Sequence, residues 1–85
     1  MKIVLRQTVD FDRWLRSLKD VRGKARILAR LTAVSERHFG DYVSVGEGVF
    51  ELRIHHGPGY RVYLIKRGQH LIVLLAGGDK GSQDR

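Results

Sequence analysis

Residues 49–66 read VFELRIHHGPGYRVYLIK, and the architecture of the whole chain can be built outward from them. Apolar and polar side chains alternate over 49–56 and again over 60–66, which is the period of a half-buried β-strand. The intervening 57–59, Gly-Pro-Gly, is typical of a turn. The stretch therefore predicts an antiparallel hairpin with one face toward a core. That face carries Phe50, Leu52, Ile54, Val62 and Leu64, and the opposite face carries Glu51, Arg53, His55, Arg61 and Tyr63.

The segments on either side of this hairpin predict further strands. Residues 70–76 form an apolar run without alternation, so we predict a central strand that is buried on both faces. Residues 67–69 join it to the hairpin as a turn. Residues 2–7 are rich in β-branched side chains and predict an N-terminal strand, which ends at Thr8 and Asp10, two candidate helix N-caps.

Two amphipathic helices are predicted between the N-terminal strand and the hairpin. The first carries one apolar stripe at i, i+3, i+4 and i+7, made of Phe11, Trp14, Leu15 and Leu18. The second is predicted from Lys24 to about His38, with Ile27, Leu28, Leu31 and Val34 directed inward. Residues 20–23 break the pattern and are predicted as the connecting loop. The result is an α+β fold in which an N-terminal strand and a helical hairpin pack on an antiparallel β-sheet.

Length and charge narrow the classes of protein to consider. The 85 residues suffice for one small domain, residues 1–85, and 16 Lys and Arg against 9 Asp and Glu give a net charge of +7. Such a surface favours nucleic acid, an anionic membrane surface or an acidic protein as partner. The absence of cysteine excludes a thiol nucleophile. No apolar run is long enough to span a membrane, and no signal-peptide pattern opens the chain, so we expect a soluble cytoplasmic protein.

The polar face of the hairpin is the first candidate site. Arginine binds phosphate oxygens bidentately and an aromatic ring stacks on an unpaired base, so Arg53, Arg61 and Tyr63 together suit single-stranded RNA. His55 on the same face is a candidate acid or base. The alternative is a solvated face with local ion pairs such as Glu51–Arg53.

Two further features are candidates for contacts with phosphate. In the glycine-rich segment 77–83 the backbone could approach a phosphate closely, with Lys80 to neutralise it, or the segment is a flexible turn. Its spacing differs from the nucleoside-triphosphate-binding loop. Arg22, Arg26 and Arg30 recur at i, i+4 and i+8 as a cationic ridge, which is either a solvated face or a docking surface for RNA or an acidic partner. No histidine pair has metal-ligand spacing, and we expect neither metal nor cofactor.

The order of elements, with Glu51-Leu52-Arg53, Gly57-Pro58-Gly59-Tyr60-Arg61-Val62-Tyr63 and Gly77-Gly78-Asp79-Lys80, resembles the RelE/ParE superfamily of bacterial toxins. Within it the pattern is most similar to the HigB-like addiction module killer proteins. The resemblance covers essentially the whole chain. It implies the toxin of a type II toxin–antitoxin system, which acts as a ribosome-dependent messenger-RNA endonuclease without a metal and is neutralised by a cognate antitoxin.

The resemblance also implies roles for individual residues. Arg61 is expected to stabilise the transition state as the RNA 2′-hydroxyl attacks the adjacent phosphate, and Arg53 to clamp that phosphate. Lys80 is expected to protonate the leaving oxygen or to hold charge. RelE-type nucleases follow this position with Tyr or His, where this chain has 81–83, Gly-Ser-Gln. Either Tyr60, Tyr63 or His55 then acts instead, or orientation and charge suffice with the ribosome supplying the rest.

Two other functions are compatible with the same fold. A ParE-like protein inhibits DNA gyrase and cuts no RNA. A non-catalytic relative binds RNA or protein only. Convergence of Arg53, Arg61 and Lys80 on one face favours the nuclease, whereas activity that maps to the helical hairpin favours the gyrase inhibitor.

Overall fold

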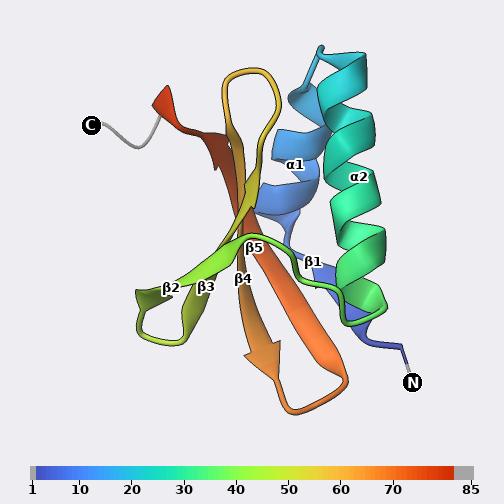
Figure 1. Ribbon diagram of the computed structural model, residues 1–85, viewed down its shortest axis with the longest axis vertical. Helices are drawn as coiled ribbons and strands as arrows, with labels where there is room; N and C mark the ends of the chain where they lie inside the picture. Colours follow the sequence, from blue (N-terminus) through green and yellow to red (C-terminus); the bar gives the residue numbers. More distant parts are fainter. Residues whose placement is uncertain (1, 82–85) are drawn as a thin grey trace.

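One strand, two helices and four further strands follow each other along the chain in a computed structural model, which describes residues 2–81 (Figure 1). The helices are α1 (Val9–Ser17) and α2 (Val21–Ser35). The strands are β1 (Val4–Gln7), β2 (Tyr42–Gly46), β3 (Val49–Ile54), β4 (Tyr60–Arg67) and β5 (Leu71–Asp79). No helix within 2–81 is long and apolar enough to cross a membrane.

The five strands form one mixed sheet in the order β1-β5-β4-β3-β2. Strands β3 to β5 form the predicted antiparallel meander. Strand β2, which was not predicted, pairs antiparallel with β3, and β1 adds to β5 in parallel. The predicted α+β class is confirmed. The prediction that 70–76 is the central strand buried on both faces is wrong, because β4 is central and only Ile72 and Leu74 of β5 are fully buried. Val73, between them, is only partly buried and lies on the face that carries no helix.

Both helices cover the same face of the sheet (Figure 1). Helix α1 begins where Thr8 Oγ1 accepts a hydrogen bond from the Phe11 N–H at 3.0 Å. Helix α2 begins at Val21, three residues before the predicted start, because the Asp20 carboxylate accepts the Gly23 N–H at 2.9 Å and caps the helix. It ends at Ser35, before the predicted His38, and the chain then turns through Arg37 at φ 69°.

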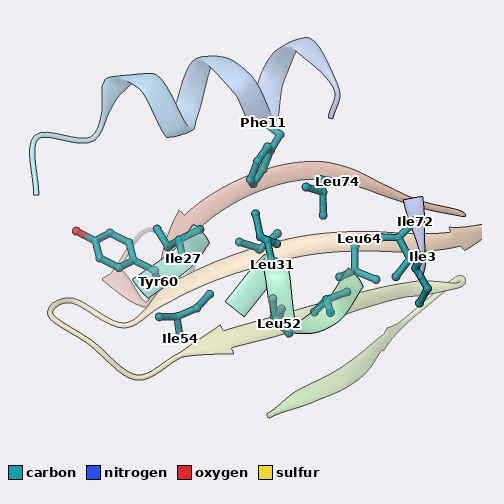
Figure 2. Close-up of a cluster of buried hydrophobic side chains, with 12 residues drawn as sticks. Ile3, Phe11, Ile27, Leu31, Leu52, Ile54, Tyr60, Leu64, Ile72 and Leu74 are labelled. Atoms are coloured by element: carbon teal, nitrogen blue, oxygen red, sulfur yellow. The ribbon is translucent and has the colours of Figure 1, made fainter. Parts of the chain in front are cut away.

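The core lies between this face of the sheet and the two helices (Figure 2). Its buried apolar side chains include Phe11 from α1, Ile27, Leu31 and Val34 from α2, and Leu52, Ile54, Val62 and Leu64 from the hairpin. Two residues that were predicted to lie in the core are less buried than expected. Phe50 is only partly buried at the margin, and Leu28 is 46% exposed because Ile27 and Leu31 already fill the side of α2 that faces the sheet. The helices thus leave the opposite face of the hairpin open.

Candidate nucleic-acid interface

The open face of the sheet carries the polar block that the alternation predicted. The register of β3 and β4 sets Glu51 opposite Tyr63 and Arg53 opposite Arg61. Side chains directly opposite each other on one face of an antiparallel pair have Cβ atoms about 5 Å apart. The two arginines are therefore neighbours, and we call Glu51, Arg53, Arg61 and Tyr63 the arginine block.

Glu51 holds the arginine block together. Only 6% of this residue is exposed, and its carboxylate accepts hydrogen bonds from Arg53 Nε at 2.9 Å, Arg61 Nη1 at 3.3 Å and the Tyr63 hydroxyl at 3.1 Å. The predicted Glu51–Arg53 ion pair is therefore present. One carboxylate faces two guanidinium groups, so the block keeps a net positive charge. The hydrogen bond to Glu51 raises the pKa of Arg53 above its ordinary value.

Arg61 combines a fixed position with unused donors. Its side chain is 15% exposed. Its Nε is the one buried side-chain nitrogen or oxygen in residues 2–81 without a hydrogen-bond partner. A guanidinium carries five N–H donors, and Glu51 takes one of them. The remaining donors of the outer nitrogens are available to an anion on the open face.

Tyr63 lies on the open face as predicted, whereas Tyr60 does not. Burial, and then the hydrogen bond to Glu51, raises the pKa of Tyr63 to about 12, so its hydroxyl stays protonated and is not a base near neutral pH. Tyr60 lies on the opposite face, 5% exposed, and donates its hydroxyl to Asp20 Oδ2 at 2.8 Å. Figure 2 shows its ring at one end of the core cluster. Tyr60 is thus unavailable for base stacking, since it shares the inward face with Val62.

The first three residues of the glycine-rich segment belong to a strand rather than to a phosphate-binding loop. Gly77, Gly78 and Asp79 belong to β5, and Gly78 pairs with Arg61. Gly77 faces α1, where a Cβ atom would lie 2.0 Å from the Trp14 ring. Lys80 follows directly, exposed, and its N–H donates to the Gly59 carbonyl at 2.9 Å. Residues 82 and 83, where the sequence departs from the RelE-type pattern, lie outside the described residues.

The cationic ridge of α2 is divided. Arg22 and Arg26 are exposed as predicted. Arg30 folds back, and its guanidinium donates to the carbonyls of Arg53, of Phe39 at 2.8 Å and of Asp41 at 3.3 Å. It therefore ties α2 to the end of β3 and to the segment before β2, and does not project as a docking cation.

His55 lies at the end of the arginine block. It follows β3, and its Nε2 approaches Asp41 Oδ2 to 2.5 Å. The hydrogen bond from His55 is the main reason that the pKa of Asp41 lies below its ordinary value. A groove of about 300 Å³ adjoins the imidazole, lined by Arg26, Ala29, Arg30, Ile54 and His55. Sequence reasoning missed Asp41, because it did not predict β2 and so gave no register between residues 14 positions apart.

Comparison with known proteins places the chain beside one sequence relative. No model of a protein family matches the chain. An uncharacterized protein of Haemophilus influenzae is 49% identical over all 85 residues, and the match covers 86% of that protein. The chain belongs to the same family as this protein.

The similar chains returned by comparison with solved structures include the following two. One is a chain of the toxin–antitoxin complex RelBE2 from Mycobacterium tuberculosis, with a TM-score of 0.64 and 21% identity over 94% of this chain and 100% of that chain. The other is a conserved hypothetical protein from Helicobacter pylori, with a TM-score of 0.49 and 16% identity over 95% and 97% of the two chains. The first likeness confirms a RelE-like fold. The finer HigB-like assignment stays a prediction.

We predict an acid-sensitive contribution to stability from Asp20, which links α2 to the hairpin. The Gly23 N–H, and then the Tyr60 hydroxyl, lower the pKa of Asp20 below its ordinary 3.8. A carboxyl with a lowered folded pKa stabilises the protein above the unfolded value and loses that effect as the pH falls through the folded one. Asp20→Asn should therefore shrink the difference in free energy of unfolding between pH 6 and pH 3, measured by urea titration.

The matched control for this prediction is Asp12→Asn, since Asp12 pairs with Arg16 on the exposed side of α1. Asp12→Asn should keep the wild-type difference in free energy of unfolding between pH 6 and pH 3. If Asp20→Asn also kept the full difference between the two pH values, the assigned role of Asp20 would be wrong.

Proposed function

We propose that this protein is the toxin of a type II toxin–antitoxin system and that it cleaves messenger RNA on the ribosome. The observation that carries the proposal is the arginine block, in which the buried Glu51 fixes Arg53 and Arg61 beside each other on an open face. The RelE-like fold, and its likeness to a chain of a toxin–antitoxin complex, support the same reading.

The chemistry we propose is attack of an RNA 2′-hydroxyl on the adjacent phosphate. The bond from phosphorus to the 5′-oxygen breaks, which leaves a 2′,3′-cyclic phosphate and a 5′-hydroxyl. Negative charge grows on the phosphate oxygens in the transition state, and donors that are already oriented stabilise it without reorganisation. Arg61 and Arg53 would supply these donors. Lys80, exposed beyond β5, would protonate the leaving oxygen or hold charge.

The proposed partners follow from the charge of the protein. With a net charge of +7, the surface would be attracted to ribosomal and messenger RNA before any specific contact forms. The exposed Arg22 and Arg26 on α2 would then contact RNA, or an acidic antitoxin segment when the toxin is neutralised. We further propose that the toxin belongs to the HigB-like group and acts in the cytoplasm.

The test is cleavage of a defined messenger RNA by the purified protein, with and without translating ribosomes, read by primer extension. We expect new 5′ ends that require ribosomes, and growth arrest when the protein is produced without an antitoxin. A parallel assay of DNA supercoiling by gyrase distinguishes messenger-RNA cleavage from the alternative function, inhibition of gyrase. Intact messages together with inhibited supercoiling would overturn the nuclease in favour of a gyrase inhibitor.

A further inference from the structure

The pair Asp41–His55 lies at one end of the arginine block and is fixed there by the backbone. The Arg53 N–H donates to the Asp41 carbonyl at 2.9 Å, so Asp41 is tied to the residue that the proposed function places on the phosphate. The Arg30 guanidinium holds the same carbonyl at 3.3 Å from α2. His55 stands two residues after Arg53 along the extended chain, a rise of about 7 Å.

The two side chains are arranged as a base and the group that orients it. The hydrogen bond from His55 lowers the pKa of the Asp41 carboxyl, and His55 Nε2 lies 2.5 Å from Asp41 Oδ2, where it would donate its proton. The lone pair of the ring is then on Nδ1. Within residues 2–81 nothing else is hydrogen-bonded to His55, and its side chain is 76% exposed. Nδ1 is therefore open to a substrate.

A substrate also has room beside the imidazole. The groove of about 300 Å³ lies between α2 and the end of β3, and its lining includes Arg26, Ala29 and Ile54 beside His55. This volume is at the lower limit of ordinary ligand pockets.

We propose that His55, oriented by Asp41, is the general base that removes the proton from the attacking RNA 2′-hydroxyl. This inference rests on the function proposed above. The proton passes from the 2′-oxygen to His55 Nδ1 as the bond from that oxygen to phosphorus forms. The bond from phosphorus to the 5′-oxygen breaks, and that oxygen takes a proton from the Lys80 ammonium or from water. The imidazolium returns its proton to solvent. His55 is thus a catalytic residue and Asp41 a positioning residue.

The other candidates for this role are placed unsuitably. Tyr60 is buried on the helical face, and the Tyr63 hydroxyl donates to Glu51. His56 lies on the other side of the chain, with its Nε2 3.8 Å from Asp20. His55 alone among these side chains is exposed next to Arg53.

The experiment measures single-turnover cleavage of a defined message on translating ribosomes from pH 5 to pH 8. The charged groups around His55 are Asp41 before β2, Arg53 on β3, and Arg26 and Arg30 on α2. Arginines keep their charge over this range, whereas a histidine ordinarily changes it. We expect His55→Ala to lower the rate about 10²- to 10⁴-fold and to flatten the rise of the rate with pH. The exposed His38 provides the control, and His38→Ala should cleave as the wild type does.

Asp41→Asn tests the positioning role. We expect a smaller loss of rate than for His55→Ala, and no additional loss when both substitutions are combined, because the two residues act as a unit. Nitrogen NMR of the imidazole should show the Nε2–H tautomer in the wild-type protein and a mixture of tautomers in Asp41→Asn. A merely structural role for Asp41 would leave the tautomer unchanged.

The outcomes separate this inference from the proposed function. If the wild type cleaves and both His55→Ala and His55→Gln cleave at its rate, the general-base assignment is overturned while the nuclease stands. If the wild type leaves every message intact on ribosomes, the proposed nuclease function is wrong. The general-base role of His55 is then wrong as well. Melting curves of both His55 variants should match the wild type, since this side chain is exposed.

Discussion

Replacing Arg61 by alanine should abolish growth arrest and lower the rate of messenger-RNA cleavage about 10²- to 10³-fold, the usual cost of one preoriented donor to a transition state. The size of the effect follows from how Arg61 is held. Its side chain is 15% exposed and bonded to the buried Glu51, so it is fixed in place before substrate arrives. The variant should remain folded, because Glu51 still accepts from Arg53 and Tyr63.

The matched control is Arg67→Ala. Arg67 lies on the same strand and on the same face as Arg61, six positions along, and it is exposed. Its removal changes the net charge equally, so a loss confined to Arg61→Ala assigns the effect to position rather than to general attraction for RNA. Arg61→Lys keeps the charge but loses the planar guanidinium. Its cleavage rate should lie between the rates of Arg61→Ala and the wild type. An Arg61→Ala protein that arrests growth as the wild type does would contradict the proposed role.

The arginine block was predictable because its causes are local. Side chains of a strand alternate between faces, so the pattern of 49–66 placed Arg53 and Arg61 together without any knowledge of the rest of the chain. The same rule placed Tyr60 inward with Val62. Assigning Tyr60 to RNA binding ignored that rule, and the structure corrected it.

The contacts that sequence reasoning missed depend on tertiary structure. Asp41 meets His55 only because β2 pairs with β3, and residues 42–46, with a serine and a glycine, gave no clear strand pattern. Arg30 has the spacing of a surface ridge, but the carbonyls of Phe39 and Asp41 lie within its reach and engage it. A helical period reveals which side of a helix is polar, and it cannot reveal which polar side chain finds an acceptor across a loop.

Gly77 is a further residue whose role depends on tertiary contacts rather than on the local pattern. Its substitution has the largest expected effect on stability. We expect Gly77→Ala to destabilise the protein by about 1–3 kcal/mol, the usual cost of overpacking a core, and to lower Tm by several degrees. The added Cβ would lie 2.0 Å from Trp14 Cε3. The indole has little room to withdraw, because it packs against Phe11 and Tyr60 at ring centroid distances of 5.7 and 6.2 Å.

A double-mutant cycle with Trp14→Ala provides the control, with free energies of unfolding from urea titration. Once the indole is removed, Gly77→Ala should cost much less than in the wild type, because the three atoms nearest the added Cβ all belong to that ring. A phosphate-binding role for the glycine predicts the opposite pattern, namely weaker RNA binding at unchanged stability. If Gly77→Ala melted at the wild-type temperature, the packing role would be wrong and the phosphate-binding loop would again be the better interpretation of residues 77–80.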